Sequence, residues 1–240
     1  MLYRLVIKSI ENLEQSLTLN PEQQHYLKRV LRLKNGDRFV ALDGQGKSYI
    51  AQLQDESAQI LENLEESTEL AISITLIVAL PKGNGFDEIV RCCTELGVTT
   101  LIPVISQRTL LKPSTHKLQR WRKIATEAAE QSERQVVPTI FEATTLKQSL
   151  KNIDKMPSNR YICVSRKPAH HLLTYLSEAP PNPVIIATGC EGGWTKAEIE
   201  MAIALGFQPV SLGRRILRAI TAPIVALSLA VSTIESETIT

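Results

Sequence analysis

Three glycines and one carboxylate lie within six residues near the carboxyl end of the chain, in the segment Thr188–Gly193. Glycine lacks the Cβ atom that would keep a backbone away from a ligand, so such a segment allows close approach. A second segment, Ser211–Pro223, combines apolar residues with the cations Arg214, Arg215 and Arg218. Backbone amides, a carboxylate, an apolar slot and cations together favour a nucleoside ligand and an electron-rich second substrate. An ordinary strand connection with solvated arginines is the alternative that these residues leave open.

Short apolar runs precede both segments and predict the strands that would position them. Val184–Thr188 and Pro209–Leu212 read as buried strands, each followed by a glycine-containing loop. In open α/β sheets, ligands bind at the carboxyl ends of such strands. A helix should begin after the first loop, because Thr195 and Glu198 form a capping box.

The elements upstream predict two domains, residues 1–70 and 71–240. The first is β-rich, with strands expected at Asp37–Leu42, Lys47–Leu53 and Gln59–Leu64. The segment Ala41–Ser48 nearly matches a phosphate-binding loop, but strand residues follow it, so a hairpin turn is predicted. From residue 71 strands alternate with helices, which is typical of an α/β domain with a mostly parallel sheet.

Positive charge gathers on two predicted helices. The first begins at Asn20-Pro21, ends near Asn35-Gly36 and should bury Leu27, Val30, Leu31 and Leu33. The second, roughly Lys117–Gln135, carries cations in its amino-terminal half, against the helix dipole, at a cost of about a few tenths of a kcal/mol per charge. We interpret these cations as contacts to RNA phosphates, although a solvated face would look similar. The candidates on these helices are Lys28, Arg29, Arg32, Arg120, Arg122, Lys123 and Arg134, and Arg108 and Lys112 just upstream of the second helix belong to the same basic patch.

Composition narrows the class of protein. The 240 residues are 43% hydrophobic and 22% charged with a net charge of +2, as in ordinary globular proteins. No apolar run approaches the ~20 residues of a membrane span, and the first residues lack the pattern of a signal peptide, so we expect a cytoplasmic protein. The four cysteines form no C-x-x-C pair and His170-His171 has no second ligand pair, so we expect no metal.

Four motifs resemble those of the RsmE family, in the family's order. GCEGGWTKAEIE followed by SLGRRILRAITA is similar to the family's GPEGG…E and LGxRILRxETA motifs. PKGNGFDEIVRCCTELGV, RWRKIATEAAEQSERQVVP and HYLKRVLRLKNGD resemble three further family segments. The resemblance covers nearly the whole chain.

That resemblance implies fold, cofactor and target. RsmE proteins are SPOUT-superfamily methyltransferases that modify N3 of a uridine in small-subunit (16S) ribosomal RNA. We therefore expect a PUA-like RNA-binding β-barrel, then a SPOUT domain with a carboxyl-terminal trefoil knot, and a homodimer. S-adenosylmethionine would lie against Thr188, Gly189, Gly192, Gly193, Ser211, Leu212, Gly213, Ile216 and Leu217. Arg218 would orient the base or stabilise its negative charge, and Glu191 would shape the cofactor loop or handle a proton.

Three positions depart from the family motifs. Cys190 replaces a proline, Ile220 replaces the glutamate of LRxET, and Cys92 replaces a lysine. These changes leave two alternatives open: a SPOUT methyltransferase for another RNA position, and a non-catalytic RNA-binding factor of ribosome assembly.

Overall fold

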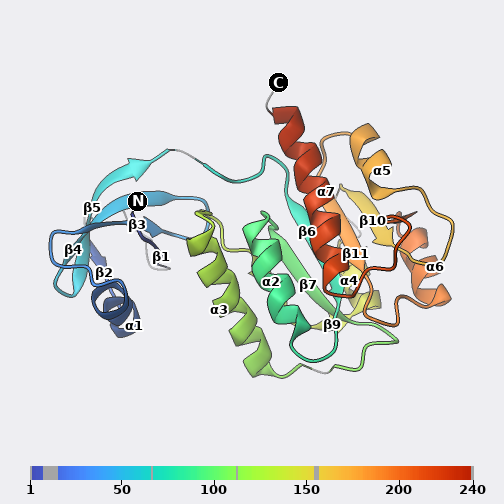
Figure 1. Cartoon of the computed structure of the whole chain (residues 1–240), viewed down its shortest axis with the longest axis horizontal. Coiled ribbons are helices and arrows are strands. Elements are labelled where there is room, and N and C mark those ends of the chain that lie inside the picture. The colour runs from blue at the N-terminus through green and yellow to red at the C-terminus, as the bar shows by residue number, and fades with distance from the viewer. Residues whose placement is uncertain (1, 8–15, 66, 112, 154–156, 239–240) are drawn as a thin grey trace. The chain divides into compact units, whose positions relative to one another are not determined.

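The computed structural model describes residues 2–7, 16–65, 67–111, 113–153 and 157–238, and it divides into two compact units (Figure 1). The first unit comprises Met1–Glu69 together with Thr126–Val137. The second comprises Leu70–Ala125 and Pro138–Thr240.

The first unit is built on a five-stranded mixed sheet in the order β1-β3-β4-β5-β2. β1 pairs with β3 in parallel and the other pairs are antiparallel, with a bulge at Ile50/Ala51 of β4. One core cluster lies between this sheet and the first helix, and its fully buried members include Phe39, Leu53 and Leu27. The strands are β1 (Arg4–Val6), β2 (Ser16–Thr18), β3 (Arg38–Leu42), β4 (Ser48–Gln54) and β5 (Ser57–Leu64).

The hairpin predicted at Ala41–Ser48 is confirmed, because β3 and β4 pair directly across it. Asp43 Oδ1 accepts hydrogen bonds from the backbone N–H groups of Gln45 and Lys47, at 2.7 and 2.9 Å. This arrangement satisfies the turn locally, and a strand follows it rather than the helix that a phosphate-binding loop requires.

The first helix begins as predicted and ends early. Asn20 and Gln23 form the predicted capping box at the start of α1 (Pro21–His25). The chain then widens into a π-helical turn, η1 (Tyr26–Val30), and the prediction of a helix to Asn35-Gly36 was wrong. The prediction that Val30 is buried was also wrong, since it is 56% exposed. A π turn rotates the residues that follow it, so the expected helical spacing no longer identifies the buried face.

The segment Thr126–Val137 packs within the first unit, although the sequence pattern placed it in the second domain. Glu133 pairs with Arg4 at 2.6 Å, and Glu130 accepts a hydrogen bond from the Val6 N–H at 2.7 Å. Glu69 accepts hydrogen bonds from the Arg134 guanidinium, at 2.6 Å to Nη2, and from the N–H groups of the two following residues.

The second unit contains a seven-stranded parallel sheet in the order β12-β10-β11-β6-β7-β8, with β9 also pairing with β7. All strand pairs of this sheet among the described residues are parallel, as the alternation of strands and helices predicts. The strand predicted at Val184–Thr188 is confirmed, and the one predicted at Pro209–Leu212 lies at Gln208–Val210. The strands are β6 (Ile74–Ala79), β7 (Thr100–Ile105), β8 (Thr139–Ile140), β9 (Thr144–Thr145), β10 (Asn159–Cys163), β11 (Val184–Thr188) and β12 (Gln208–Val210).

Helices cover both faces of this sheet (Figure 1). On one face α4 and α6 pack on Ile77, Ile185 and Ala187. Alternate residues of β6 and β11 point to the opposite face, where α7 contacts both strands as well as α2 and α5. The helices are α2 (Gly85–Glu95), α3 (Thr115–Gln131), α4 (Leu146–Ile153), α5 (Leu172–Glu178), α6 (Lys196–Ala204) and α7 (Thr221–Thr238).

Candidate functional site

Two predicted ligand loops lie at one edge of the parallel sheet. The glycine loop, Gly189–Gly193, follows β11, and the arginine loop, Ser211–Ile220, follows β12. β10 lies between these strands and pairs in parallel with both, so all three strands end at the same edge. Open parallel sheets bind ligands at this edge.

A third loop at the same edge was missed from the sequence. The segment 164–171 follows β10, and its His170 carbonyl accepts a hydrogen bond from the Ser211 N–H at 2.8 Å. The Leu172 N–H returns a hydrogen bond to the Ser211 carbonyl at 2.9 Å. Arg166 adopts a left-handed φ of 60°, which is uncommon for a residue other than glycine. Only the order of the strands identifies this loop as part of the site, because β10 lies between β11 and β12, whose loops were predicted to bind the ligand.

The glycine loop is folded tightly on itself. The Gly193 N–H donates to the Cys190 carbonyl at 2.8 Å, and Gly193 has a φ of +64°. A Cβ on Gly189 would lie 3.1 Å from the Gly193 Cα and 3.4 Å from the Trp194 nitrogen. Alanine at position 189 would therefore crowd the backbone of the same loop, whereas the close approach to a ligand that we predicted stays a prediction.

Groups from two distant segments hold the glycine loop in place. Arg108 Nη1 donates to the Gly192 carbonyl at 2.6 Å, and the Arg108 stem would lie 3.0 Å from a Cβ on Gly192. Glu191 Oε1 accepts a hydrogen bond from the Lys82 N–H at 3.0 Å. The Glu191 carboxylate, which belongs to the glycine loop, and the Arg108 guanidinium, which contacts it from another segment, therefore both help to fix the shape of this loop.

The start of α6 fixes where the glycine loop ends. Thr195 and Glu198 form the predicted capping box, and Glu198 is only 4% exposed. The other oxygen of the Glu198 carboxylate, Oε1, accepts the Gln107 N–H at 2.8 Å. One buried carboxylate thus joins the helix start to the segment that carries Arg108.

Two buried polar atoms beside the glycine loop lack a hydrogen-bond partner among the described residues. They are the Thr188 hydroxyl, on a fully buried side chain, and the Trp194 Nε1, on a side chain that is 7% exposed. An unpaired buried polar group costs roughly 1–3 kcal/mol, so each marks a place where a ligand or a water completes the site.

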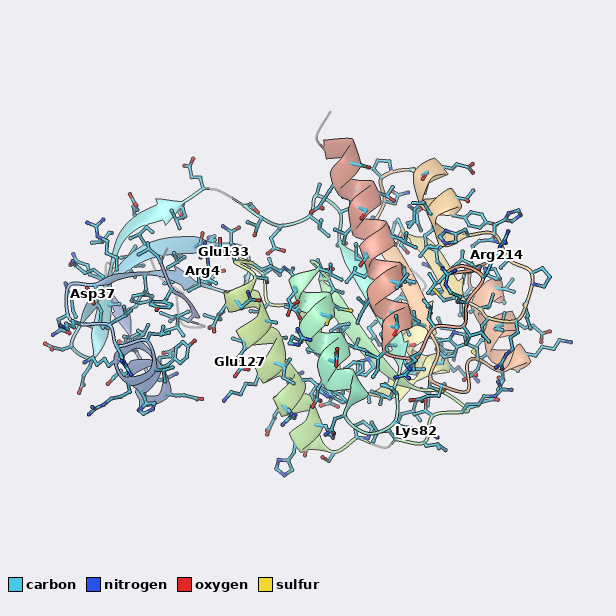
Figure 2. All side chains as sticks on the ribbon, viewed as in Figure 1. Arg4, Asp37, Lys82, Glu127, Glu133 and Arg214 are labelled. Atoms are coloured by element: carbon cyan, nitrogen blue, oxygen red, sulfur yellow. The ribbon has the colours of Figure 1, made fainter. Side chains whose placement is uncertain are left out.

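The arginine loop presents free cations. Arg214, Arg215 and Arg218 are exposed, and none makes an ion pair or side-chain hydrogen bond with a residue that the structure describes. Figure 2 labels Arg214 on this loop. The Ser211 hydroxyl accepts the Gly213 N–H at 3.1 Å, and Gly213 has a φ of +113°. Ile216, predicted to contact the cofactor, is 61% exposed.

Comparisons with known proteins agree with this geometry. The family model described as an RNA methyltransferase domain matches residues 68–231, and one described as an RNA methyltransferase PUA domain matches residues 19–62. Ribosomal RNA small subunit methyltransferase E of Synechocystis is 51% identical over 232 residues, covering 95% of this chain and 77% of the relative. The Bacillus subtilis protein of the same name is 31% identical, covering 89% of this chain and 88% of the relative.

The chain belongs to the RsmE family of RNA methyltransferases.

A solved RsmE-family structure shares this fold. The Neisseria gonorrhoeae protein, solved bound to S-adenosyl methionine, superposes with a TM-score of 0.83 at 32% identity, covering 95% of this chain and 96% of that chain. The predicted α/β fold with a parallel sheet and a PUA-like amino-terminal unit is confirmed.

The three departures from the RsmE motifs have defined surroundings. Cys190 is buried, and its Sγ lies 3.7 Å from the Ser106 hydroxyl. Ile220 lies against Gly85, where a Cβ would come within 2.9 Å of its Cδ1. Cys92 is half-buried, and burial raises the pKa of its thiol, so it stays neutral near pH 7.

The cations that we predicted to contact RNA differ in their exposure and in their contacts. Arg134 is 3% exposed and pairs with Glu69, so its guanidinium belongs to the interior of the first unit. Arg120 pairs with Asp87 at 2.8 Å, and Arg122 Nη2 donates to the Ile140 carbonyl at 3.1 Å. Lys112 lies outside the described residues. Lys28, Arg29 and Arg32 lie on exposed or half-exposed surface of the first unit, and Lys123 is exposed on α3.

An exposed aromatic pair lies in the first unit and was missed from the sequence. Tyr3 is 50% exposed and Tyr26 is 36% exposed. Burial, followed by the charges of Glu130 and Glu127 and the nearby Tyr3, raises the pKa of Tyr26. Tyr26 is the first residue of η1, which also carries Lys28 and Arg29.

No helix in the described part of the chain is long and apolar enough to cross a membrane. Within the same residues, no cluster of three or more His, Cys, Asp or Glu side chains is arranged to hold a metal ion.

Proposed function

We propose that this chain transfers a methyl group from S-adenosylmethionine to N3 of a uridine in small-subunit ribosomal RNA. The observation that carries the proposal is that the glycine loop and the arginine loop follow strands that flank β10 and end at the same edge of the parallel sheet. Membership of the RsmE family and the S-adenosyl methionine bound to a relative with the same fold support it.

The residues at this edge fit the cofactor. The Thr188 hydroxyl is buried and unpartnered among the described residues, and Gly189, Gly192 and Gly193 keep side chains away from the loop. When bound, the sulfonium would supply an electrophilic methyl group. The residues proposed to hold it are Thr188, Gly189, Gly192, Gly193, Ser211, Leu212, Gly213, Ile216 and Leu217.

Two side chains from the family motifs have separate proposed roles. The Arg218 guanidinium is exposed and makes no ion pair with a described residue, so it is free to orient the uracil and to stabilise its developing negative charge. The Glu191 carboxylate accepts the Lys82 N–H, so we propose that it fixes the shape of the glycine loop.

The first unit is proposed to bind RNA. Lys28, Arg29 and Arg32 would contact phosphates, and the exposed rings of Tyr3 and Tyr26 would stack on unpaired bases. In the second unit, Lys123, Arg120 and Lys112 remain proposed phosphate contacts. We propose instead that Arg108 positions the glycine loop through the Gly192 carbonyl, and that Arg122 holds the chain at the Ile140 carbonyl.

Further features follow from the family resemblance and belong to the same proposal. They are a trefoil knot near the carboxyl end, a homodimer with the site at its interface, action in the cytoplasm and a reaction without metal.

A second candidate is methylation of a different RNA position. Ile220 and Cys92 favour it, because they stand where the family motifs have a glutamate and a lysine and so change two charged positions.

The test is to map methyl groups on ribosomal RNA from a strain that lacks the gene, before and after treatment of its small subunits with the protein and labelled S-adenosylmethionine. Label on N3 of one uridine is expected. Label on any other atom or nucleotide would refute the proposal and favour the second candidate, and no label at all would refute both.

A further inference from the structure

A lysine that the family motifs left without a role lies beside the glycine loop, three residues before a glycine that touches the arginine loop. We propose that Lys82 holds the uracil and stabilises its negative charge during methyl transfer. This inference rests on the proposed function and assigns a residue to its base-binding side.

The position of Lys82 follows from the sheet. It belongs to the lysine loop, Pro81–Asn84, which follows β6. β6 pairs in parallel with β11, and Val78 lies opposite Thr188. The lysine loop and the glycine loop therefore leave neighbouring strands at the same edge.

Two contacts tie the lysine loop and the residue after it to the ligand loops. The Lys82 N–H donates to Glu191 Oε1 of the glycine loop at 3.0 Å. At the start of α2, a Cβ on Gly85 would lie 2.9 Å from Ile220 Cδ1 of the arginine loop. The backbone of Lys82 is thus fixed beside the glycine loop, three residues before a glycine that touches the arginine loop.

The Lys82 side chain is free to serve a ligand. It is exposed, and its ammonium makes no hydrogen bond or ion pair with a residue that the structure describes (Figure 2). The nearest acids along the chain are engaged elsewhere, since Asp87 accepts hydrogen bonds from Arg120 and Trp121. The Glu191 carboxylate accepts a hydrogen bond from the backbone N–H of Lys82.

The departure at position 220 strengthens this assignment. The RsmE motif has a glutamate where this chain has Ile220, and that position touches the start of α2. Ile220 therefore leaves no carboxylate at this position, close to the residues that follow Lys82, that could pair with the ammonium. A solvated lysine without a role is the alternative that the experiment must exclude.

A cation beside the base, in addition to Arg218, would assist the reaction. Uracil N3 first releases its proton to water, which leaves a negative charge shared by N3 and the two carbonyl oxygens. N3 then forms a bond to the methyl carbon while the carbon–sulfur bond breaks, and that electron pair stays on sulfur. An ammonium beside a carbonyl oxygen stabilises the anion and lowers the pKa of the bound N3–H.

The experiment compares Lys82→Met, Lys82→Arg and a control, Lys151→Met, in the full chain. Lys151 is an exposed lysine in the last turn of α4 and belongs to none of the loops. The substrate is small-subunit ribosomal RNA transcribed with uridine or with 5-fluorouridine, alone and assembled with the small-subunit proteins. Fluorine lowers the pKa of N3, so the anion forms with less help.

Lys82→Met should lower the single-turnover rate on uridine RNA roughly 10- to 100-fold and move the pH profile to higher pH. Its affinity for S-adenosylmethionine by calorimetry should stay within about twofold of wild type, because the loss is confined to the reacting base. On 5-fluorouridine RNA the defect should shrink to less than about threefold. Lys82→Arg should keep most of the rate, and Lys151→Met all of it.

An equal loss on both RNAs, a loss of cofactor affinity that matches the loss of rate, or an unchanged rate would overturn the assignment of Lys82. If the wild type places no methyl group on N3, the proposed function fails and the assignment fails with it. If the wild type methylates N3 and the fluorouridine rescue is absent, only the assignment of Lys82 fails.

Discussion

Replacing Gly189 with alanine tests the shape of the glycine loop most sharply. The new methyl group would lie 3.1 Å from the Gly193 Cα, 3.3 Å from its carbonyl carbon and 3.4 Å from the Trp194 nitrogen. All three are backbone atoms, so no side chain can rotate away, and the loop must open. Overpacking of this kind costs ~1–3 kcal/mol. At about 1.4 kcal/mol per factor of ten, the affinity for S-adenosylmethionine should fall roughly 5- to 150-fold.

The assay is calorimetric titration of S-adenosylmethionine into wild type, Gly189→Ala and a control, Lys151→Met. Lys151 is exposed in the last turn of α4 and belongs to neither ligand loop. The control should therefore keep the affinity of wild type. Equal affinity for wild type and Gly189→Ala, with unchanged thermal stability, would refute the reasoning that backbone contact in this loop shapes the cofactor site.

Four further changes probe other parts of the molecule. Glu69→Ala should lower the free energy of unfolding in urea by roughly 3–5 kcal/mol, because Arg134 would keep a buried charge without that carboxylate; a loss below about 1 kcal/mol would contradict this. Burial raises the pKa of Glu130 to about 7, so its favourable contribution is present below its unfolded pKa and is lost as the pH rises through 7. Urea unfolding of wild type should therefore lose up to ~3 kcal/mol between pH 4.5 and pH 8 relative to Glu130→Gln, and parallel pH curves would count against it. Arg218→Ala should lower turnover far more than cofactor affinity, and loss of binding with unchanged turnover at saturation would show that the assigned role is wrong. Tyr26→Ala should weaken binding of single-stranded RNA by roughly 1–3 kcal/mol in a filter assay, with no change in its salt dependence, if the ring stacks on a base.

Local signals predicted most of the elements that position the site. The Thr195–Glu198 capping box depends on residues three apart, and the strand Val184–Thr188 is a short apolar run beside a glycine. Such features are determined by neighbours along the chain, so sequence patterns identify them directly.

Contacts between distant residues escaped prediction. The Lys82 N–H and the Glu191 carboxylate are 109 positions apart, and Arg108 reaches a carbonyl 84 positions away. Periodicity carries no information on such pairs. Arg134 was predicted to contact RNA because it is a cation near other cations, and only the fold shows that it is buried against Glu69.

The prediction that Val30 is buried was wrong for a different reason. Its spacing from Leu27 matches one face of an α-helix, yet the chain forms a π-helical turn over Tyr26–Val30. Local backbone geometry overrode the spacing there.

The most direct measurement is a crystal structure of this chain with S-adenosylmethionine. We expect the cofactor to lie against the glycine loop and the arginine loop, with a hydrogen bond to the Thr188 hydroxyl. A cofactor bound elsewhere, or the two loops far apart around it, would contradict the central claim.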